Sequence, residues 1–112
     1  MDMIKSTVAG LTVNYTIEVG GTEGLNFSGR YVVLTTEYDL VNLVASNELS
    51  YDVSGNVPAQ YTVQNATSVA GMFQKTDEEG TLEVKIMKGG ELMDSANTSD
   101  AWGAVLVTVV NQ

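Results

Sequence analysis

Apolar and polar residues alternate along most of the chain. Between residues 11 and 19 every odd position is apolar and every even position is polar, which is typical of a strand with one buried and one wet face. The alternation returns over residues 25–33, 49–53, 61–63, 69–73 and 82–86. Glycine-rich or acidic turns separate these runs at 20–24, 77–80 and 88–91. The side chains predicted to form the core are Tyr15, Ile17, Phe27, Tyr31, Val84, Ile86 and Leu106.

The last predicted strand, from about residue 101 to 110, is apolar on both faces. A strand of this kind lies under a loop or helix, or its second face meets another subunit. Trp102 is expected to be a core residue. The apolar second face is expected to self-associate, and residues 1–10 are a candidate for a strand added to a neighbour's sheet edge. The residues predicted to take part are Ile4, Val8, Val105, Val107 and Val109.

Residues 37–46 are the one ambiguous stretch, because their apolar positions fit neither the helical nor the strand period. Thr36 followed by Asp39 resembles a helix capping box with Asp in place of Glu. A short helix and a strand therefore both remain open. In either case we expect this stretch to connect one sheet to the other.

The composition favours the all-β class. Val occurs 16 times and Thr 12 times, and β-branched side chains fit a pleated sheet better than a helix. Turn signals recur about every ten residues, which is typical of a sandwich or small barrel. We therefore predict a single domain spanning residues 1–112, an immunoglobulin-like two-sheet sandwich of seven to nine antiparallel strands.

The charge and the missing residue types exclude several classes of function. The net charge is -9, and the chain has neither Cys nor His. Thiol catalysis, disulfides, Cys/His zinc sites and a His general base are thereby ruled out. A strongly acidic chain is also a poor partner for nucleic acid or an anionic membrane. We expect a protein that is not an enzyme and needs no cofactor.

Four Asn-x-Ser/Thr tripeptides are the strongest additional motif, and they make the protein a candidate for N-glycosylation. The alternative is that Asn and Thr simply populate an exposed β surface. If the sites are glycosylated, the protein is extracellular. The four candidate asparagines are Asn14, Asn26, Asn65 and Asn97.

Acidic residues gather in one predicted turn, formed by Asp77, Glu78 and Glu79. Carboxylates in a loop are candidate ligands for Ca²⁺, although the spacing is not that of an EF-hand. The favoured interpretation is a solvated charge run that keeps the surface soluble and discourages edge pairing.

Three stretches, residues 13–22, 55–63 and 80–92, resemble strands and turns of secreted sandwich domains of the MmpS-type transport accessory family. The first reads VNYTIEVGGT, the second GNVPAQYTV and the third GTLEVKIMKGGEL. The resemblance implies an immunoglobulin-like fold and an extracytoplasmic accessory or binding module beside a membrane transporter.

Taken together, the sequence favours a non-enzymatic structural or adhesive subunit of a cell surface or an extracellular filament. A phage or virus structural protein, located in the virion, is the first alternative. The transporter accessory module is the second. The expected partner is another copy of the chain or another surface protein.

Overall fold

The computed structural model describes residues 13–37 and 45–110, and these residues fold into strands and turns without a helix. The all-β prediction is confirmed. All of the pairings between strands are antiparallel. The strands are β1 (Val13–Gly21), β2 (Asn26–Glu37), β3 (Ala45–Asn56), β4 (Ala59–Ala66), β5 (Ser68–Lys75), β6 (Leu82–Lys88), β7 (Glu91–Thr98) and β8 (Ala104–Val110).

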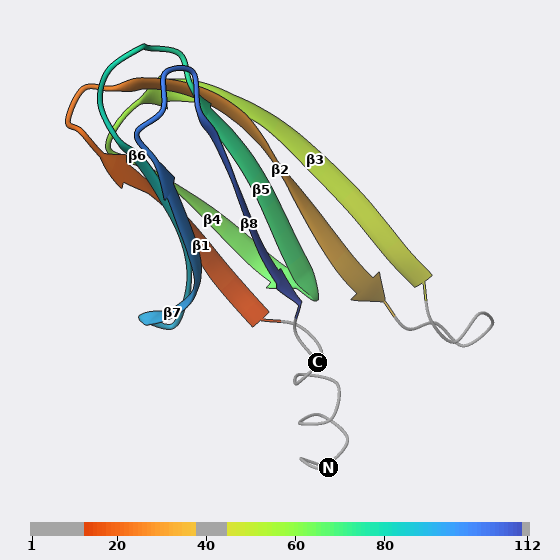
Figure 1. Cartoon of the computed structure of the whole chain (residues 1–112). Coiled ribbons are helices and arrows are strands. Elements are labelled where there is room, and N and C mark those ends of the chain that lie inside the picture. The colour runs from red at the N-terminus through yellow and green to blue at the C-terminus, as the bar shows by residue number, and fades with distance from the viewer. Residues whose placement is uncertain (1–12, 38–44, 111–112) are drawn as a thin grey trace.

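The strands form two sheets of four, which pack face to face (Figure 1). Sheet A has the order β4-β1-β6-β7, and sheet B has the order β3-β2-β5-β8. The predicted two-sheet sandwich and its number of strands are confirmed. β1 and β6 are the central strands of sheet A, and β2 and β5 are the central strands of sheet B.

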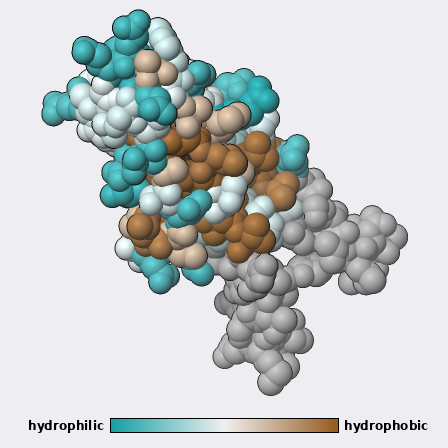
Figure 2. Space-filling model, viewed as in Figure 1, coloured by the Kyte–Doolittle hydropathy of each residue, from teal (hydrophilic) through white to brown (hydrophobic). Residues whose placement is uncertain are grey.

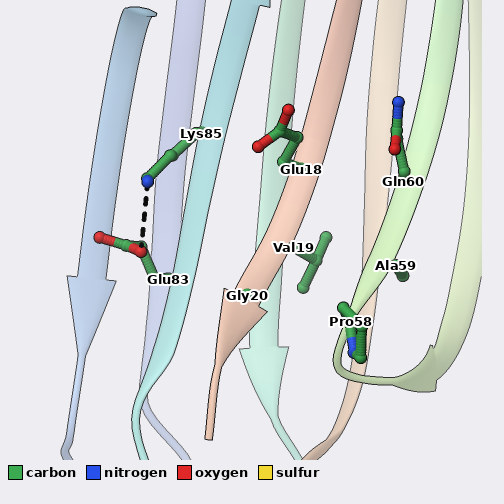
Figure 3. Close-up of a pocket in the computed structure, with 8 residues that line it drawn as sticks. All are labelled: Glu18, Val19, Gly20, Pro58, Ala59, Gln60, Glu83 and Lys85. Carbon is green, nitrogen blue, oxygen red and sulfur yellow. Dashed lines mark ion pairs between the residues drawn. The ribbon is translucent and has the colours of Figure 1, made fainter. Parts of the chain in front are cut away.

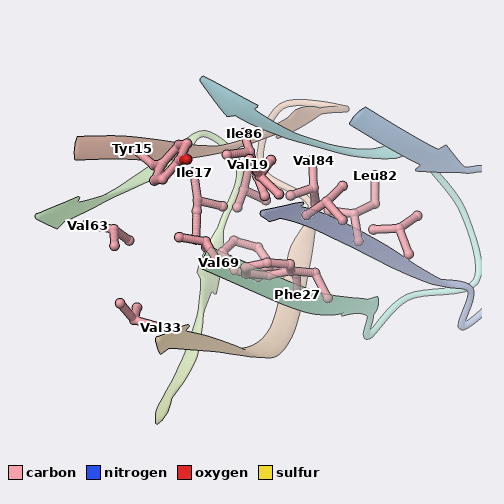
Figure 4. Packing of buried hydrophobic residues seen from close by; sticks show 14 of the residues in the cluster. Tyr15, Ile17, Val19, Phe27, Val33, Val63, Val69, Leu82, Val84 and Ile86 are labelled. Carbon is pink, nitrogen blue, oxygen red and sulfur yellow. The ribbon is translucent and has the colours of Figure 1, made fainter. Parts of the chain in front are cut away.

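The core lies between the sheets and is built by the inward residues of each alternation (Figure 4). Five of the seven predicted core side chains are buried, namely Tyr15, Ile17, Phe27, Val84 and Ile86. Tyr31 is half-buried and packs against the edge of the core. Leu106 is exposed, so its assignment to the core was wrong.

Residues 37–46 do not connect the two sheets, which corrects that expectation. β2 and β3 are neighbours in sheet B and pair without interruption from Asn26 with Asn56 to Glu37 with Ala45. Glu37, Ala45 and Ser46 are thus strand residues, while residues 38–44 lie outside the described part of the chain. The continuous pairing of twelve residues on each side makes this pair of strands one long hairpin arm.

The two sheets are offset by one strand. β4, at one edge of sheet A, packs over β2, while β7, at the other edge, packs against β8. The side at β7 and β8 is closed by a hydrogen bond of 2.8 Å from the Thr108 N–H to Asp94 Oδ2. On the opposite side β3 extends beyond β4, and no described strand of sheet A covers it closely (Figure 1).

Two glycines of sheet B make room for the buried ring of Phe73. Gly29 is the direct partner of Phe73 across β2 and β5, and Gly71 lies on the same inward face. A Cβ atom at Gly29 would stand 2.6 Å from Phe73 Cδ1 and 2.6 Å from the Met72 carbonyl oxygen. A Cβ atom at Gly71 would stand 2.7 Å from Phe73 Cε2. The ring therefore lies over backbone that must remain free of side chains.

Replacing Gly29 with Ala is expected to destabilise the protein by about 1–3 kcal/mol, because an overpacked site must displace backbone and ring together. Gly55→Ala is the matched control on β3, since the nearest atom to its added Cβ, Phe27 Cζ, is 3.9 Å away. Urea unfolding of the two variants measures the difference. Equal stability of the two variants would contradict the tight approach of Phe73 to β2.

Burial raises the pKa of three tyrosines above the ordinary value of 10.0, namely Tyr15, Tyr31 and Tyr61. For Tyr31 the nearby Tyr51 and Tyr61 hydroxyls add to the increase in pKa. The Tyr15 hydroxyl is buried and has no hydrogen-bond partner among the described residues. The stability that these raised pKa values contribute is complete below about pH 10 and is lost as the pH rises through the folded-state values.

Tyr15→Phe removes a buried hydroxyl that has no partner in the described structure. We expect the free energy of unfolding at neutral pH to stay the same or to rise by up to about 1 kcal/mol. Above about pH 10 the variant should lose less stability than the parent, because one fewer buried phenol must ionise. Urea unfolding at both pH values checks this, and a loss above about 1 kcal/mol at neutral pH would reveal a partner for the hydroxyl.

Candidate functional site

The outer face of sheet B carries an apolar surface formed by three adjacent strands. We call it the apolar face, and it consists of Val32 and Leu34 from β2, Ala70 and Met72 from β5, and Leu106 and Val110 from β8. Figure 2 shows hydrophobic residues gathered over these strands in the view of Figure 1. The pairing places Leu106 beside Met72 and Val32 beside Ala70, so the side chains are cross-strand neighbours.

The apolar face is open to solvent. Val110 is 66% exposed, Leu106 61% and Met72 57%. A shallow hollow of about 200 Å³ lies between Val32, Met72 and Leu106, over the small residues Ala70 and Gly71. Large contiguous apolar patches are uncommon on monomers and are typical of interaction sites.

Arg30 stands at the edge of the apolar face, and its Nε donates a hydrogen bond of 2.6 Å to Asp52 Oδ1 on β3. This hydrogen bond, together with the guanidinium charge, lowers the pKa of the Asp52 carboxyl. Both side chains are exposed, so the pair adds little to stability. The guanidinium charge of Arg30 at the edge of the apolar face is therefore paired with the Asp52 carboxylate.

The outer face of sheet A has the opposite character. Its polar hollow, of about 290 Å³, is lined in part by Glu18, Gln60, Glu83 and Lys85 (Figure 3). Lys85 Nζ lies 3.7 Å from Glu83 Oε1, and both side chains are part-exposed. No aromatic side chain lines this hollow, so it offers no stacking platform for a ring. The sandwich therefore has one polar and one apolar outer face.

Val105, Val107 and Val109 do not form the exposed stripe that was predicted for the last strand. All three are buried and face sheet A, which corrects their assignment as self-association residues. The reason is that both faces of β8 are apolar, so the alternation could not tell which face turns inward. The exposed stripe exists on the opposite face, and it joins that of β5 and β2. Ile4 and Val8 lie outside the described residues.

Trp102 was also assigned wrongly to the core. It lies in the turn before β8, is 53% exposed and has a positive φ of 57°. Its backbone N–H donates to the Asp77 carbonyl oxygen at 3.2 Å, and its carbonyl oxygen accepts from Gln74 Nε2 at 3.0 Å. The turn is thus held by hydrogen bonds to the Trp102 main chain, and the indole ring is exposed.

The four glycosylation candidates, Asn14, Asn26, Asn65 and Asn97, are all exposed. Asn14 Oδ1 accepts a hydrogen bond of 2.9 Å from the Asn65 N–H, which ties the start of β1 to the end of β4. Asn26 Oδ1 accepts a hydrogen bond from Asn56 Nδ2. The side-chain amides of Asn14 and Asn26 therefore have structural roles, whereas those of Asn65 and Asn97 make no hydrogen bond within the described part of the chain.

The acidic turn does not gather its carboxylates into a cation site. Asp77, Glu78 and Glu79 are exposed, and Asp77 Oδ1 accepts a hydrogen bond of 3.2 Å from the Glu79 N–H. Within residues 13–37 and 45–110, no group of three or more carboxylates is placed to hold a metal ion. The same residues include no helix long and apolar enough to cross a membrane.

Lys75 is a buried residue that the sequence analysis did not single out. Its side chain is 0% exposed, and Nζ donates a hydrogen bond of 2.8 Å to the Asp100 carbonyl oxygen. Its backbone N–H donates to the Gly103 carbonyl oxygen at 2.8 Å. Lys75 therefore fastens the β7–β8 loop over one end of the core. Continuing the alternation of β5 by two residues past Phe73 would have placed it inward.

Lys75→Ala is expected to cost about 2–5 kcal/mol, since it empties a fully buried site and releases the loop. Lys75→Met keeps most of the packed volume and removes one hydrogen bond, so its cost is expected to be at most about 1 kcal/mol. Urea unfolding checks this order of stability. Equal losses in the two variants would mean that the ammonium group, which both of them lack, fixes the loop, and not the packing.

No protein-family model matches this chain, and no curated protein matches it at a significant level. The resemblance to MmpS-type accessory domains therefore stays a prediction.

Proposed function

We propose that the chain is a non-enzymatic structural subunit that assembles with further copies through the apolar face of sheet B. The observation that carries this proposal is the run of exposed apolar side chains across β2, β5 and β8. Burial of such side chains is favourable by about 25 cal/mol per Å² of apolar surface. A cell surface or an extracellular filament is the proposed setting, supported by the exposure of the four Asn-x-Ser/Thr asparagines.

The flatness of this face favours a protein partner over a small ligand. Small-molecule sites are concave and surround most of the ligand surface. The hollow on the apolar face holds about 200 Å³ and is lined almost wholly by apolar side chains, with Arg30 as its charged member. Packing of a second sheet against it, at about 10 Å, would bury the exposed residues in the manner of a sandwich core.

The area of the apolar face limits how stable an assembly through this face alone can be. Three strands of seven residues cover roughly 300 Å², using spacings of about 4.8 Å between strands and 3.3 Å per residue. A stable interface buries about 800 Å² of accessible surface on each partner. The apolar face alone therefore supports a weak contact, and a lasting assembly requires a second contact on each subunit.

Leu106→Asp is expected to weaken self-association, because it places a charge among the exposed apolar side chains of the apolar face. Ser95→Asp is the matched control, since it adds the same charge on β7, on the outer face of sheet A and at the opposite edge from β4. Light scattering at high protein concentration and moderate salt measures the mass of both variants and the parent. The proposal predicts a lower mass for Leu106→Asp alone. A monomeric parent, or an equal loss in both variants, would overturn it.

A further inference from the structure

A groove opens on the side of the sandwich where β3 extends beyond β4. It has a volume of about 250 Å³ and lies between the inner face of β2 and β3 and the edge of β4. Its apolar lining consists of Tyr31, Val33, Leu49, Tyr51 and Val63, and its uncharged polar lining of Thr35, Thr62 and Gln64. This groove is separate from the apolar face, which lies on the other side of sheet B.

The side chains of β3 in this groove point inward and are nevertheless uncovered. Leu49 pairs with Val33 and Tyr51 pairs with Tyr31, so both share the inward face of those residues. Yet Leu49 is 47% exposed and Tyr51 is 43% exposed. The offset of the two sheets explains this, because sheet A ends at β4 and has no strand above β3 among the described residues.

The lining of the groove is suited to an uncharged occupant that offers both apolar side chains and main-chain polar groups. The Tyr31 and Tyr51 rings stack with centroids 5.0 Å apart, and the Tyr31 and Tyr61 rings lie 5.6 Å apart. The neighbouring charged residues of β3, Glu48 and Asp52, alternate with Leu49 and Tyr51 and so belong to the opposite face. No Asp, Glu, Lys or Arg lines the groove.

The groove is also bordered by a strand edge that can form hydrogen bonds. β4 pairs with β1 on one side and is the last strand of sheet A on the other. An extended segment placed about 4.8 Å beside β4 would lie over β3 and would pair with the main chain of β4. Alternate side chains of that segment would enter the groove. Binding of this kind, by strand addition, takes affinity from main-chain hydrogen bonds and specificity from the side-chain pockets.

We propose that this groove binds the segment preceding β1 of a second copy of the chain, added as a strand beside β4. The inference deepens the proposed subunit role and rests on it, because it supplies the second contact that a lasting assembly needs. Twelve residues precede Val13 and, when extended, span up to about 40 Å. The eight residues of β4 span about 26 Å, which leaves residues to bridge between subunits.

The sequence of the segment and its attachment both favour donation to another subunit. Ile4 and Val8 are four residues apart and would point to the same side of a strand, toward the groove. The segment joins β1 at Val13, opposite Ala66 on the paired side of β4. To reach the free side of β4 in its own subunit, the chain would have to cross the end of β4 and reverse its direction. A neighbour's β4 can be reached without that reversal.

Cysteine cross-linking tests the contact, because the chain has no natural cysteine. One full-length variant carries Ile4→Cys and a second carries Leu49→Cys. The two are mixed and treated with a short bismaleimide, and peptide mass mapping identifies the joined cysteines. The expected product joins Cys at position 4 of one chain to Cys at position 49 of the other. Since each chain has one cysteine, this product can form only between subunits.

Leu92→Cys on β7 is the control, as Leu92 has a similar exposure and lies on the opposite edge of the sandwich. The proposal requires a yield with position 49 several-fold above the yield with position 92. Equal yields would overturn it. Cross-linking confined to single chains of an Ile4→Cys/Leu49→Cys double variant would also overturn it, and would show that each subunit fills its own groove.

The same experiment in the Leu106→Asp background separates the two proposals. If cross-linking to position 49 persists there while the assembled mass falls, both contacts are present and act independently. If the parent chain assembles but gives no specific cross-link, strand donation is wrong and the apolar face stands alone. A parent chain that is monomeric and does not cross-link overturns both proposals.

Discussion

Strands β2, β5 and β8 of sheet B carry apolar side chains on both faces, and one sheet packed against them can cover only one face. Val105, Val107 and Val109 fill the core against sheet A, while Leu106 and Val110 on the same strand are left in solvent. Exchanging the two faces of β8 would not remove the difficulty, because either set would leave an exposed stripe. One apolar face therefore stays uncovered whichever way β8 is turned. The outer surface of the molecule is polar on the side of sheet A and apolar on the side of sheet B.

The offset between the sheets adds a second asymmetry. At one side β7 reaches past sheet B, and Asp94 caps a β8 N–H, so that the edge of β8 is partly closed to pairing. At the other side the β2–β3 arm reaches past sheet A and leaves Leu49 and Tyr51 half-covered. A protein that is closed to pairing on one side and open on the other is suited to directional contacts, in which one surface of a subunit meets a different surface of the next.

The sequence predicted the strands best where one face is apolar and the other polar. β1 and β6 alternate in this way, so Ile17 and Ile86 were placed correctly in the core. β8 has two apolar faces, so its inward face was decided by packing against sheet A, which the alternation does not encode. β7 follows the turn predicted at 88–91 but shows no clear alternation, because Leu92 and Met93 are adjacent and the rest of the strand, apart from Ala96, is polar. The inner groove depends on the offset of whole sheets and could not be deduced from local patterns.

The net charge of -9 limits how any two copies approach. Like charges repel at long range, but salt screens this repulsion within about 8–10 Å near physiological ionic strength. Among the described residues of β2, β5 and β8 that face outward, Arg30 is the one charged side chain, and Asp52 partly neutralises it. The groove, too, has no Asp, Glu, Lys or Arg in its lining. Repulsion thus comes mainly from the rest of the surface, since the apolar face carries only the paired Arg30 among its described outward residues and the groove lining carries no charge. Salt should therefore control mainly the rate at which copies meet, while the apolar contacts determine how long they stay together.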